Sequence, residues 1–148
     1  MSASQATHQD AELILKLYDL RREPVMREAR NVVLGFWPKS VDEILTITNA
    51  FGSKENAYLR QVYGYWEMAA ALVVHGTLNV LLVFDTCQEM YFQYAKIQPY
   101  VADFRKKMNL PEWMISIERL IERSKTGRKR LATMQKNLAA MATERPRR

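Results

Sequence analysis

The chain has 148 residues, of which 48% are apolar and 26% are charged, and it carries a formal net charge of +6 at pH 7. These values are those of an ordinary globular protein that can bury one core, and they exclude a chain that is disordered throughout. Cys87 is the only cysteine, so an intramolecular disulfide and a cysteine-based metal site are both excluded.

The N-terminal part of the chain is predicted to form one long helix or two shorter ones. Thr7 suits the N-cap position and Asp10 the N3 position, in the manner of a capping box. The apolar residues that follow keep a helical spacing, but Pro24 falls inside the pattern. The helix therefore either kinks at Pro24 or restarts with this proline in its first turn. The opening residues lack the basic start and apolar run of a secretory signal, so a cytoplasmic location is expected.

Two further helices are predicted between residues 40 and 76. Ser40 and Glu43 form a capping box that opens a short helix, and Gly52 closes this helix. Ser53 or Asn56 then caps a helix over residues 56–75, which is rich in apolar and aromatic side chains. This composition predicts the central and most buried helix of the fold.

An uncharged run over residues 68–84 is 17 residues long, at the lower edge of the length that crosses a bilayer. Its centre holds His75, Gly76, Thr77 and Asn79, and unpaired polar groups are costly in lipid. The His-Gly pair also suits a helix C-terminus followed by a turn. Two buried helices that meet at a corner therefore explain the run better than a transmembrane span does.

The rest of the chain is divided by prolines and a glycine. Asp85 is expected to cap a helix that runs to about residue 98, and Pro99 breaks or restarts it before it continues to about residue 108. Pro111 suits the first position of a helix that resumes at Glu112 and runs to about residue 125. Gly127 is expected to interrupt the helix there, before a last amphipathic segment.

The last helix has an apolar stripe that consists of Leu131, Met134, Leu138 and Met141. The stripe is expected to fold back onto its own domain, and the alternative is that it pairs with a second copy or a partner. The sequence as a whole predicts an all-α fold, a single-domain irregular bundle of six to eight helices over residues 1–142. A flexible basic tail is predicted over residues 143–148.

Glu67 is a carboxylate in the middle of the helix that is predicted to be most buried. At 100° per residue, Arg60 lies about 20° from Glu67 around the helix axis, and Tyr63 lies between them. His75 continues the same stripe with some drift. Small neighbours such as Gly64 would let another helix approach closely and desolvate the carboxylate, which then favours a cationic partner.

Two interpretations of this polar stripe are open. In the first, Glu67 forms a structural ion pair, either with Arg60, which would have to reach along the helix, or with an arginine of the N-terminal helix. The candidate arginines are Arg21, Arg22, Arg27 and Arg30. In the second, Arg60, Tyr63, Glu67 and His75 form a small polar pocket in which Glu67 or His75 acts as an acid or base. The ion pair with an arginine of the N-terminal helix is the preferred interpretation, because structural ion-pair networks shift side-chain pKa values as active sites do, although they catalyse no reaction.

Sequence signals for a metal, a cofactor or an enzyme are weak. The two histidines, His8 and His75, stand at no spacing that suits metal ligands. Dinucleotide-binding, P-loop and nucleophile-elbow motifs are all missing. Cys87 is interpreted as a small buried side chain. We therefore predict no metal, no cofactor and no catalytic residue, and we favour a protein that is not an enzyme.

Positive charge is concentrated at the C-terminal end. Residues 105–148 carry 13 basic and 4 acidic side chains, so the whole positive excess lies there. The candidate anion-binding residues are Arg123, Lys125, Arg128, Lys129 and Arg130. Such a concentration suits phosphates or an anionic surface. Trp113 precedes the basic run and is not interleaved with it, so base stacking is not indicated.

Three segments carry a resemblance to a known family: DAELILKLYDLRREPVMREAR at residues 10–30, NAYLRQVYGYWEMAAALVVHGTL at 56–78, and FDT at 84–86. Together they resemble a family of small, all-helical bacterial proteins of unknown function. The resemblance extends to about residue 104 and fades in the basic C-terminal part. It implies a bacterial, intracellular setting and a single helical domain, and it implies no activity or cofactor.

The sequence favours a function in protein–protein contacts, including contact with a second copy in a homodimer. Eight methionines and seven tyrosines support this expectation, because Met and aromatic residues are enriched at interfaces. The first alternative is binding of nucleic acid or an anionic surface through residues 105–148. The second is a small-molecule binder or enzyme that uses the polar stripe of Arg60, Glu67 and His75.

Overall fold

The computed structural model describes residues 4–144, most of which are helical. The α-helices are α1 (His8–Arg22), α2 (Pro24–Leu34), α3 (Val41–Asn49), α4 (Lys54–Val74), α5 (Val80–Thr86), α6 (Gln88–Ile97), α7 (Val101–Met108), α8 (Ile115–Glu122) and α9 (Lys125–Glu144), with a 3-10 turn, Gln98–Tyr100, before α7. The predicted all-α bundle is confirmed. Of the predicted tail at 143–148, the first two residues belong to α9 and the others lie outside the described residues.

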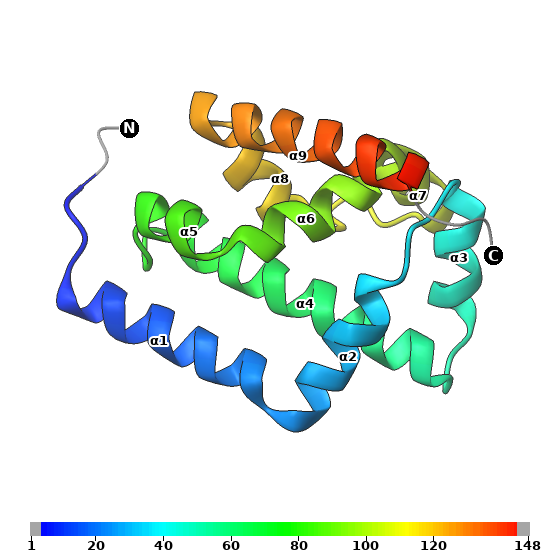
Figure 1. Ribbon diagram of the computed structural model, residues 1–148, viewed down its shortest axis with the longest axis horizontal. Helices are drawn as coiled ribbons and strands as arrows, with labels where there is room; N and C mark the ends of the chain where they lie inside the picture. Colours follow the sequence, from blue (N-terminus) through cyan, green and yellow to red (C-terminus); the bar gives the residue numbers. More distant parts are fainter. Residues whose placement is uncertain (1–3, 145–148) are drawn as a thin grey trace.

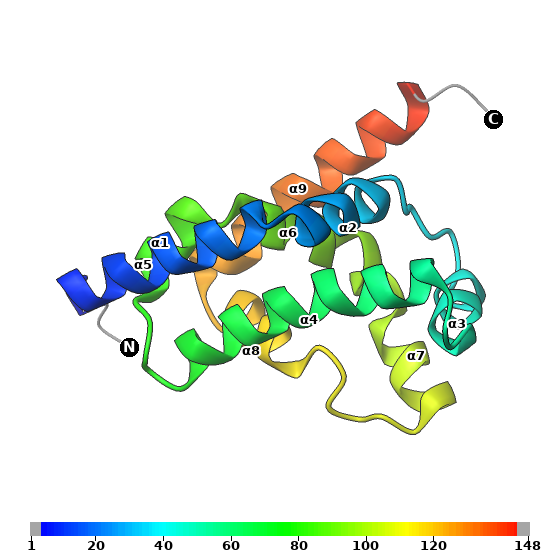
Figure 2. The same cartoon turned by 90° about the horizontal axis from the view of Figure 1, so that it is seen from below.

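The long helix α4 lies at the centre of the bundle, where it packs against α2, α3 and α8 (Figure 1). Its core-facing side chains Val62, Trp66 and Ala69 are fully buried. Helix α9 packs against α6 and α8, and α1 contacts α2 and α5. Figure 2 shows α4 lying between α1–α2 and α8 when the molecule is turned by 90°. The apolar face of α4 is therefore the surface on which α2, α3 and α8 pack.

The first helix begins at the predicted capping box. The Thr7 hydroxyl oxygen accepts a hydrogen bond from the Asp10 amide (3.2 Å), and the Asp10 carboxylate accepts one from the Thr7 amide (2.7 Å). The other carboxylate oxygen accepts from the amide of Asn79 (2.8 Å). The hydrogen bonds that the carboxylate accepts, from the Thr7 amide first, then from the Thr7 hydroxyl and the Asn79 amide, lower the pKa of Asp10 from its ordinary value. Ionised Asp10 thus joins the start of α1 to the start of α5.

The helix at Pro24 restarts and does not kink. Glu23, between α1 and α2, has an extended backbone with φ −57° and ψ 137°. Its carboxylate accepts a hydrogen bond from the Met26 amide (2.8 Å), and Pro24 takes the first position of α2. Pro99 lies in the short 3-10 turn that connects α6 to α7. The two prolines therefore separate helices, as one of the two predicted alternatives requires.

The uncharged run over residues 68–84 is divided between α4 and α5. His75 is the C-cap of α4, and Gly76 follows with φ 77°, a left-handed conformation that favours glycine. The predicted corner between two helices is confirmed. Within the described part of the chain, no helix is both long enough and apolar enough to pass through a bilayer.

Three predicted helix boundaries are wrong. Asp85 lies inside the last turn of α5 and pairs with Arg130, so it does not cap α6. Helix α8 starts at Ile115 and not at Glu112, because Met114 takes a left-handed conformation with φ 56°. Gly127 lies within the first turn of α9 and does not interrupt a helix.

Candidate functional site

Glu67 forms the cap of another helix. One oxygen of its carboxylate accepts a hydrogen bond from the Ser116 amide (2.8 Å), and the other accepts from the Ile117 amide (3.0 Å). These amides belong to the first turn of α8, which no side chain at its own N-cap position satisfies. A carboxylate at a helix N-terminus also interacts favourably with the helix dipole. Glu67 therefore holds α8 against α4.

The preferred sequence interpretation, an ion pair between Glu67 and an arginine of the N-terminal helix, is wrong. Arg30 pairs with Glu89 instead, with 2.5 Å between Nη2 and Oε2. Arg21 donates a hydrogen bond to the Tyr65 hydroxyl and lies over the Trp66 ring, 5.0 Å from its centroid. Backbone amides of α8 bind the Glu67 carboxylate where an arginine is expected. The uncapped end of a helix has free N–H groups, and these can donate hydrogen bonds to a carboxylate just as a guanidinium can.

A pocket of about 340 Å³ opens beside Glu67, and we call it the α4 pocket. Its walls are largely apolar and include Leu59, Ile97 and Trp113. Arg60 and Glu67 also line it, and Gly64 lies between these two residues on α4. A Cβ atom added at Gly64 would meet no atom within 4 Å, so the pocket reaches the backbone of the helix.

Arg60 and Tyr63 are both fixed by hydrogen bonds. The Arg60 Nε donates to the side-chain oxygen of Asn56 (3.0 Å), and Asn56 itself donates to carbonyl groups at the end of α3. The Tyr63 hydroxyl donates to the backbone carbonyl of Gln93 (2.9 Å), and burial raises the pKa of this hydroxyl. Tyr63 thus forms part of the pocket wall, whereas Arg60 places a guanidinium, fixed by its hydrogen bond to Asn56, at the edge of the pocket.

The fourth predicted residue, His75, does not join the other three. It is exposed at the C-terminal end of α4 and does not line the pocket. Eight residues separate it from Glu67, which corresponds to a rotation of about 80° around the helix axis and a rise of about 12 Å. The structure therefore brings together Arg60, Tyr63 and Glu67 and leaves His75 apart.

Sequence reasoning missed the partners that complete this site. The amides of Ser116 and Ile117 carry no side-chain signature, but α8 begins without a Ser, Thr, Asp or Asn at its N-cap, and that omission is a signal for a cap from elsewhere. In the sequence, Gly64 is interpreted as a small residue that lets a neighbouring helix approach. In the structure no atom lies within 4 Å of the position that its Cβ would take, so the space beside Gly64 is empty.

The apolar stripe of α9 is used largely within its own domain, as preferred. Leu131 and Leu138 are buried, Met134 is half-buried, and Met141 remains 46% exposed. Helix α9 packs against α6 and α8 through this face.

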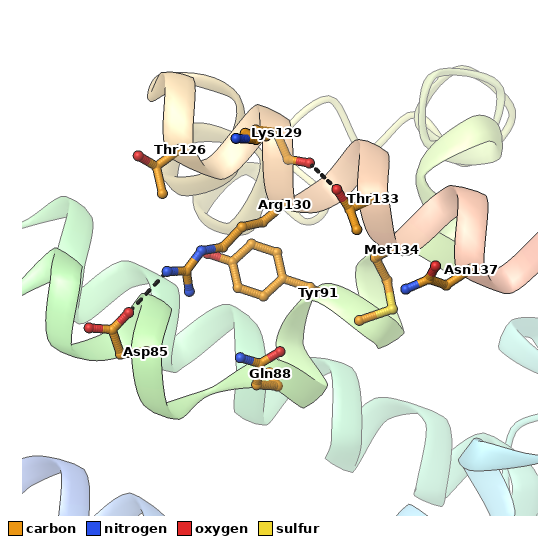
Figure 3. A pocket seen from close by; sticks show the side chains of 9 residues that line it. All are labelled: Asp85, Gln88, Tyr91, Thr126, Lys129, Arg130, Thr133, Met134 and Asn137. Atoms are coloured by element: carbon orange, nitrogen blue, oxygen red, sulfur yellow. Dashed lines mark hydrogen bonds and ion pairs between the residues drawn. The ribbon is translucent and has the colours of Figure 1, made fainter.

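The basic residues predicted to bind anions are not all in one place. Lys129 and Arg130 line a cleft between α6 and α9 (Figure 3). Arg128 donates to the Glu122 carbonyl (2.5 Å), and Arg123 and Lys125 are exposed outside the cleft. Within residues 4–144, no group of three or more His, Cys, Asp or Glu side chains is placed to hold a metal ion.

These features define an all-α bundle with an apolar pocket against its central helix, lined also by a guanidinium and by two carboxylates, one of which caps a helix. Residues 6–124 match the family described as a domain of unknown function, DUF4760, and the chain belongs to this family. No curated protein and no solved structure matches the chain. The residues that line the α4 pocket all fall within the matched range, whereas α9 follows it.

Proposed function

We propose that this protein binds a small molecule in the α4 pocket. The observation that supports the proposal is a pocket of about 340 Å³ with apolar walls and three charged residues, Arg60, Glu67 and Glu112, in its lining. Ligand sites of roughly 300–1,000 Å³ typically combine apolar walls with a few placed polar groups. Gly64 leaves the floor of the pocket open, so a ligand can lie directly on the α4 backbone.

The positions of the two charged residues on α4 indicate the shape of the ligand. Arg60 and Glu67 are seven residues apart on one face of α4, which separates their Cα atoms by about 10 Å along the helix axis. Gly64 lies between them. The complementary molecule is elongated, with an anionic or acceptor group towards Arg60, an apolar middle over Gly64, and a cationic or donor group towards Glu67.

The same contacts favour binding over catalysis. Both Glu67 oxygens already accept hydrogen bonds from α8, which fixes the position of the carboxylate. The Tyr63 hydroxyl donates its hydrogen bond to the Gln93 carbonyl. We therefore propose a binding protein in which the pocket residues orient the ligand and do not exchange protons with it.

Filling the floor of the pocket tests the proposal. We expect para-aminomethyl-phenylacetate, which has an amine and a carboxylate at opposite ends of an aromatic ring, to bind the native chain in a saturation-transfer NMR experiment. Gly64→Leu places a side chain in the open space and is expected to abolish the signal. Gln61→Leu, on an exposed side of the same helix, is the matched control and should retain it. Equal signals from the native chain and Gly64→Leu would contradict the proposal.

Self-association is a second candidate function. Several apolar side chains remain exposed on the first two helices, among them Leu15, Tyr18, Val25 and Val32. A homodimer that buries the same surface from each copy would cover them. We expect a dimer by light scattering after size exclusion, and a monomer for Leu15→Glu combined with Val32→Glu. Leu110→Glu, at an exposed apolar residue elsewhere, is the control. A native monomer at every concentration would rule this candidate out.

A further inference from the structure

We propose that the cleft between α6 and α9 binds a small organic phosphate. The cleft has a volume of about 550 Å³ and shares no lining residue with the α4 pocket. Asp85 at the end of α5 and Gln88 and Tyr91 on α6 form one wall, and Lys129, Arg130 and Asn137 on α9 form the other (Figure 3). This site is independent of the proposed function of the α4 pocket.

Arg130 is held in place before any ligand arrives. Its guanidinium donates hydrogen bonds to the Phe84 carbonyl and to the Asp85 carboxylate, the latter at 3.0 Å, and it lies over the Phe84 ring, 5.8 Å from the centroid. Holding the side chain reduces the entropy that binding would cost. The Asp85 side chain is 67% exposed, and an exposed ion pair of this kind is weak. A phosphate dianion can therefore displace Asp85 from Arg130.

Tyr91 supplies the second observation. The residue is only 2% exposed, and its hydroxyl has no hydrogen-bond partner among the described residues. Figure 3 shows the Arg130 side chain crossing the hydroxyl end of the Tyr91 ring. Burial raises the pKa of Tyr91, so the hydroxyl keeps its proton at neutral pH and can act only through that proton or its lone pairs. An unpaired buried hydroxyl is costly, and an oxygen of a phosphate that pairs with Arg130 in place of Asp85 would accept its hydrogen bond.

The remaining lining residues favour a small phosphate ester over a polymer. The amides of Gln88 and Asn137 can donate hydrogen bonds, and half-buried Met134 offers apolar surface to the organic part. The volume is that of a site for a complete small molecule and exceeds the need of a bare ion. The aromatic ring in the cleft, that of Tyr91, is buried and cannot stack on the successive bases of a nucleic-acid strand.

The test is a titration of the full chain with phenyl phosphate and with inorganic phosphate, followed by amide chemical shifts in NMR. We expect saturable shifts at residues 88, 129 and 130, with phenyl phosphate the tighter ligand. Lys129→Gln, which leaves the contacts of Arg130 intact, should weaken binding about tenfold. Tyr91→Phe should weaken it about fivefold without lowering the melting temperature, because the hydroxyl makes no hydrogen bond to any other residue of the described range 4–144.

The matched control is the double variant Arg123→Gln, Lys125→Gln, which removes two exposed basic charges that do not line the cleft. Its affinity should change by less than about twofold, since exposed charges at a distance are screened. Two results would overturn the proposal, because they would show that anions bind a diffuse basic surface and not the cleft. One is an equal loss of affinity in this control, and the other is tighter binding of a single-stranded oligonucleotide that depends on Arg123 and Lys125. A lack of saturable shifts would also overturn it. Gly64→Leu should leave phosphate affinity unchanged, so the two proposed sites can fail separately.

Discussion

Replacement of Gly127 by alanine is expected to destabilise the protein by about 2–3 kcal/mol. A Cβ atom at this position would lie 2.2 Å from the carbonyl oxygen of Ile121 and 2.9 Å from the Ser124 hydroxyl oxygen. Ile121 is fully buried, and its backbone cannot move aside without disturbing the end of α8. Thermal unfolding followed by circular dichroism should show a melting temperature about 5–10 °C below that of the native chain.

Gly64→Ala is the matched control for this prediction. Both glycines lie within helices, but a Cβ atom at Gly64 meets nothing within 4 Å. Alanine is the better helix former by about 1 kcal/mol, so Gly64→Ala should raise stability by roughly 0.5–1 kcal/mol. The same substitution therefore has opposite signs at the two positions. A stabilising effect at Gly127 would mean that α9 does not approach α8 as closely as the structure has it.

Helix ends that are set by neighbouring residues could be predicted from the sequence. Thr7, Ser40 and Ser53 each accept a hydrogen bond from the amide three residues later, as their positions before apolar segments indicate. The corner at His75 and Gly76 is equally local, because a glycine with positive φ ends the helix. These signals need no knowledge of the partner helix, and for that reason the bundle and most of its boundaries could be predicted.

Boundaries that depend on distant residues could not be predicted. Asp85 has the side chain of a cap, but in the fold it meets Arg130, a residue 45 positions away. Helix α8 begins where Glu67 of another helix supplies its cap, 49 residues from Ser116. Gly127 is needed for a close approach to Ile121 and not for a break in the helix. In each case the sequence shows a residue type that suits two roles, and only the tertiary contact selects one.

The candidate site could be predicted only in part, because local helix geometry follows from the sequence and tertiary contacts do not. Helical geometry alone places Arg60, Tyr63 and Glu67 on one face of α4, and all three line the pocket. The sequence pattern includes His75 in the stripe, but His75 lies about 80° from Glu67 around the helix axis and so falls outside that face. The apolar walls come from α3, α6 and the segment before α8, and the sequence contains no signal for which helices meet there.

Glu67 therefore has a structural task that also shapes the pocket. By holding the first turn of α8, its carboxylate fixes the segment that contains Trp113 and Met114, and both of these residues line the α4 pocket. A change at Glu67 would alter the stability of α8 and the geometry of the pocket together. Only a measurement that follows the amides of α8 directly can separate these two effects.

Glu67→Ala is expected to lower the free energy of unfolding by about 2 kcal/mol, because it removes the acceptors of two backbone amides and the charge that complements the helix dipole. Glu67→Gln keeps one carbonyl acceptor and should lose about 1 kcal/mol. Hydrogen exchange is the direct measurement. The amides of Ser116 and Ile117 should exchange faster in Glu67→Ala, while those of α1 keep their native protection relative to global unfolding.

Glu112→Ala is the control for this experiment, because Glu112 is an exposed carboxylate that lines the same pocket. Its effect on stability should stay within about 0.5 kcal/mol. If Glu67→Ala kept the native stability, and if the amides of Ser116 and Ile117 stayed as protected from hydrogen exchange as in the native chain, the carboxylate would not be the cap of α8. Glu67 would then be a charge placed beside an apolar pocket with no structural reason for its position, and direct contact with a ligand would become the main explanation for it.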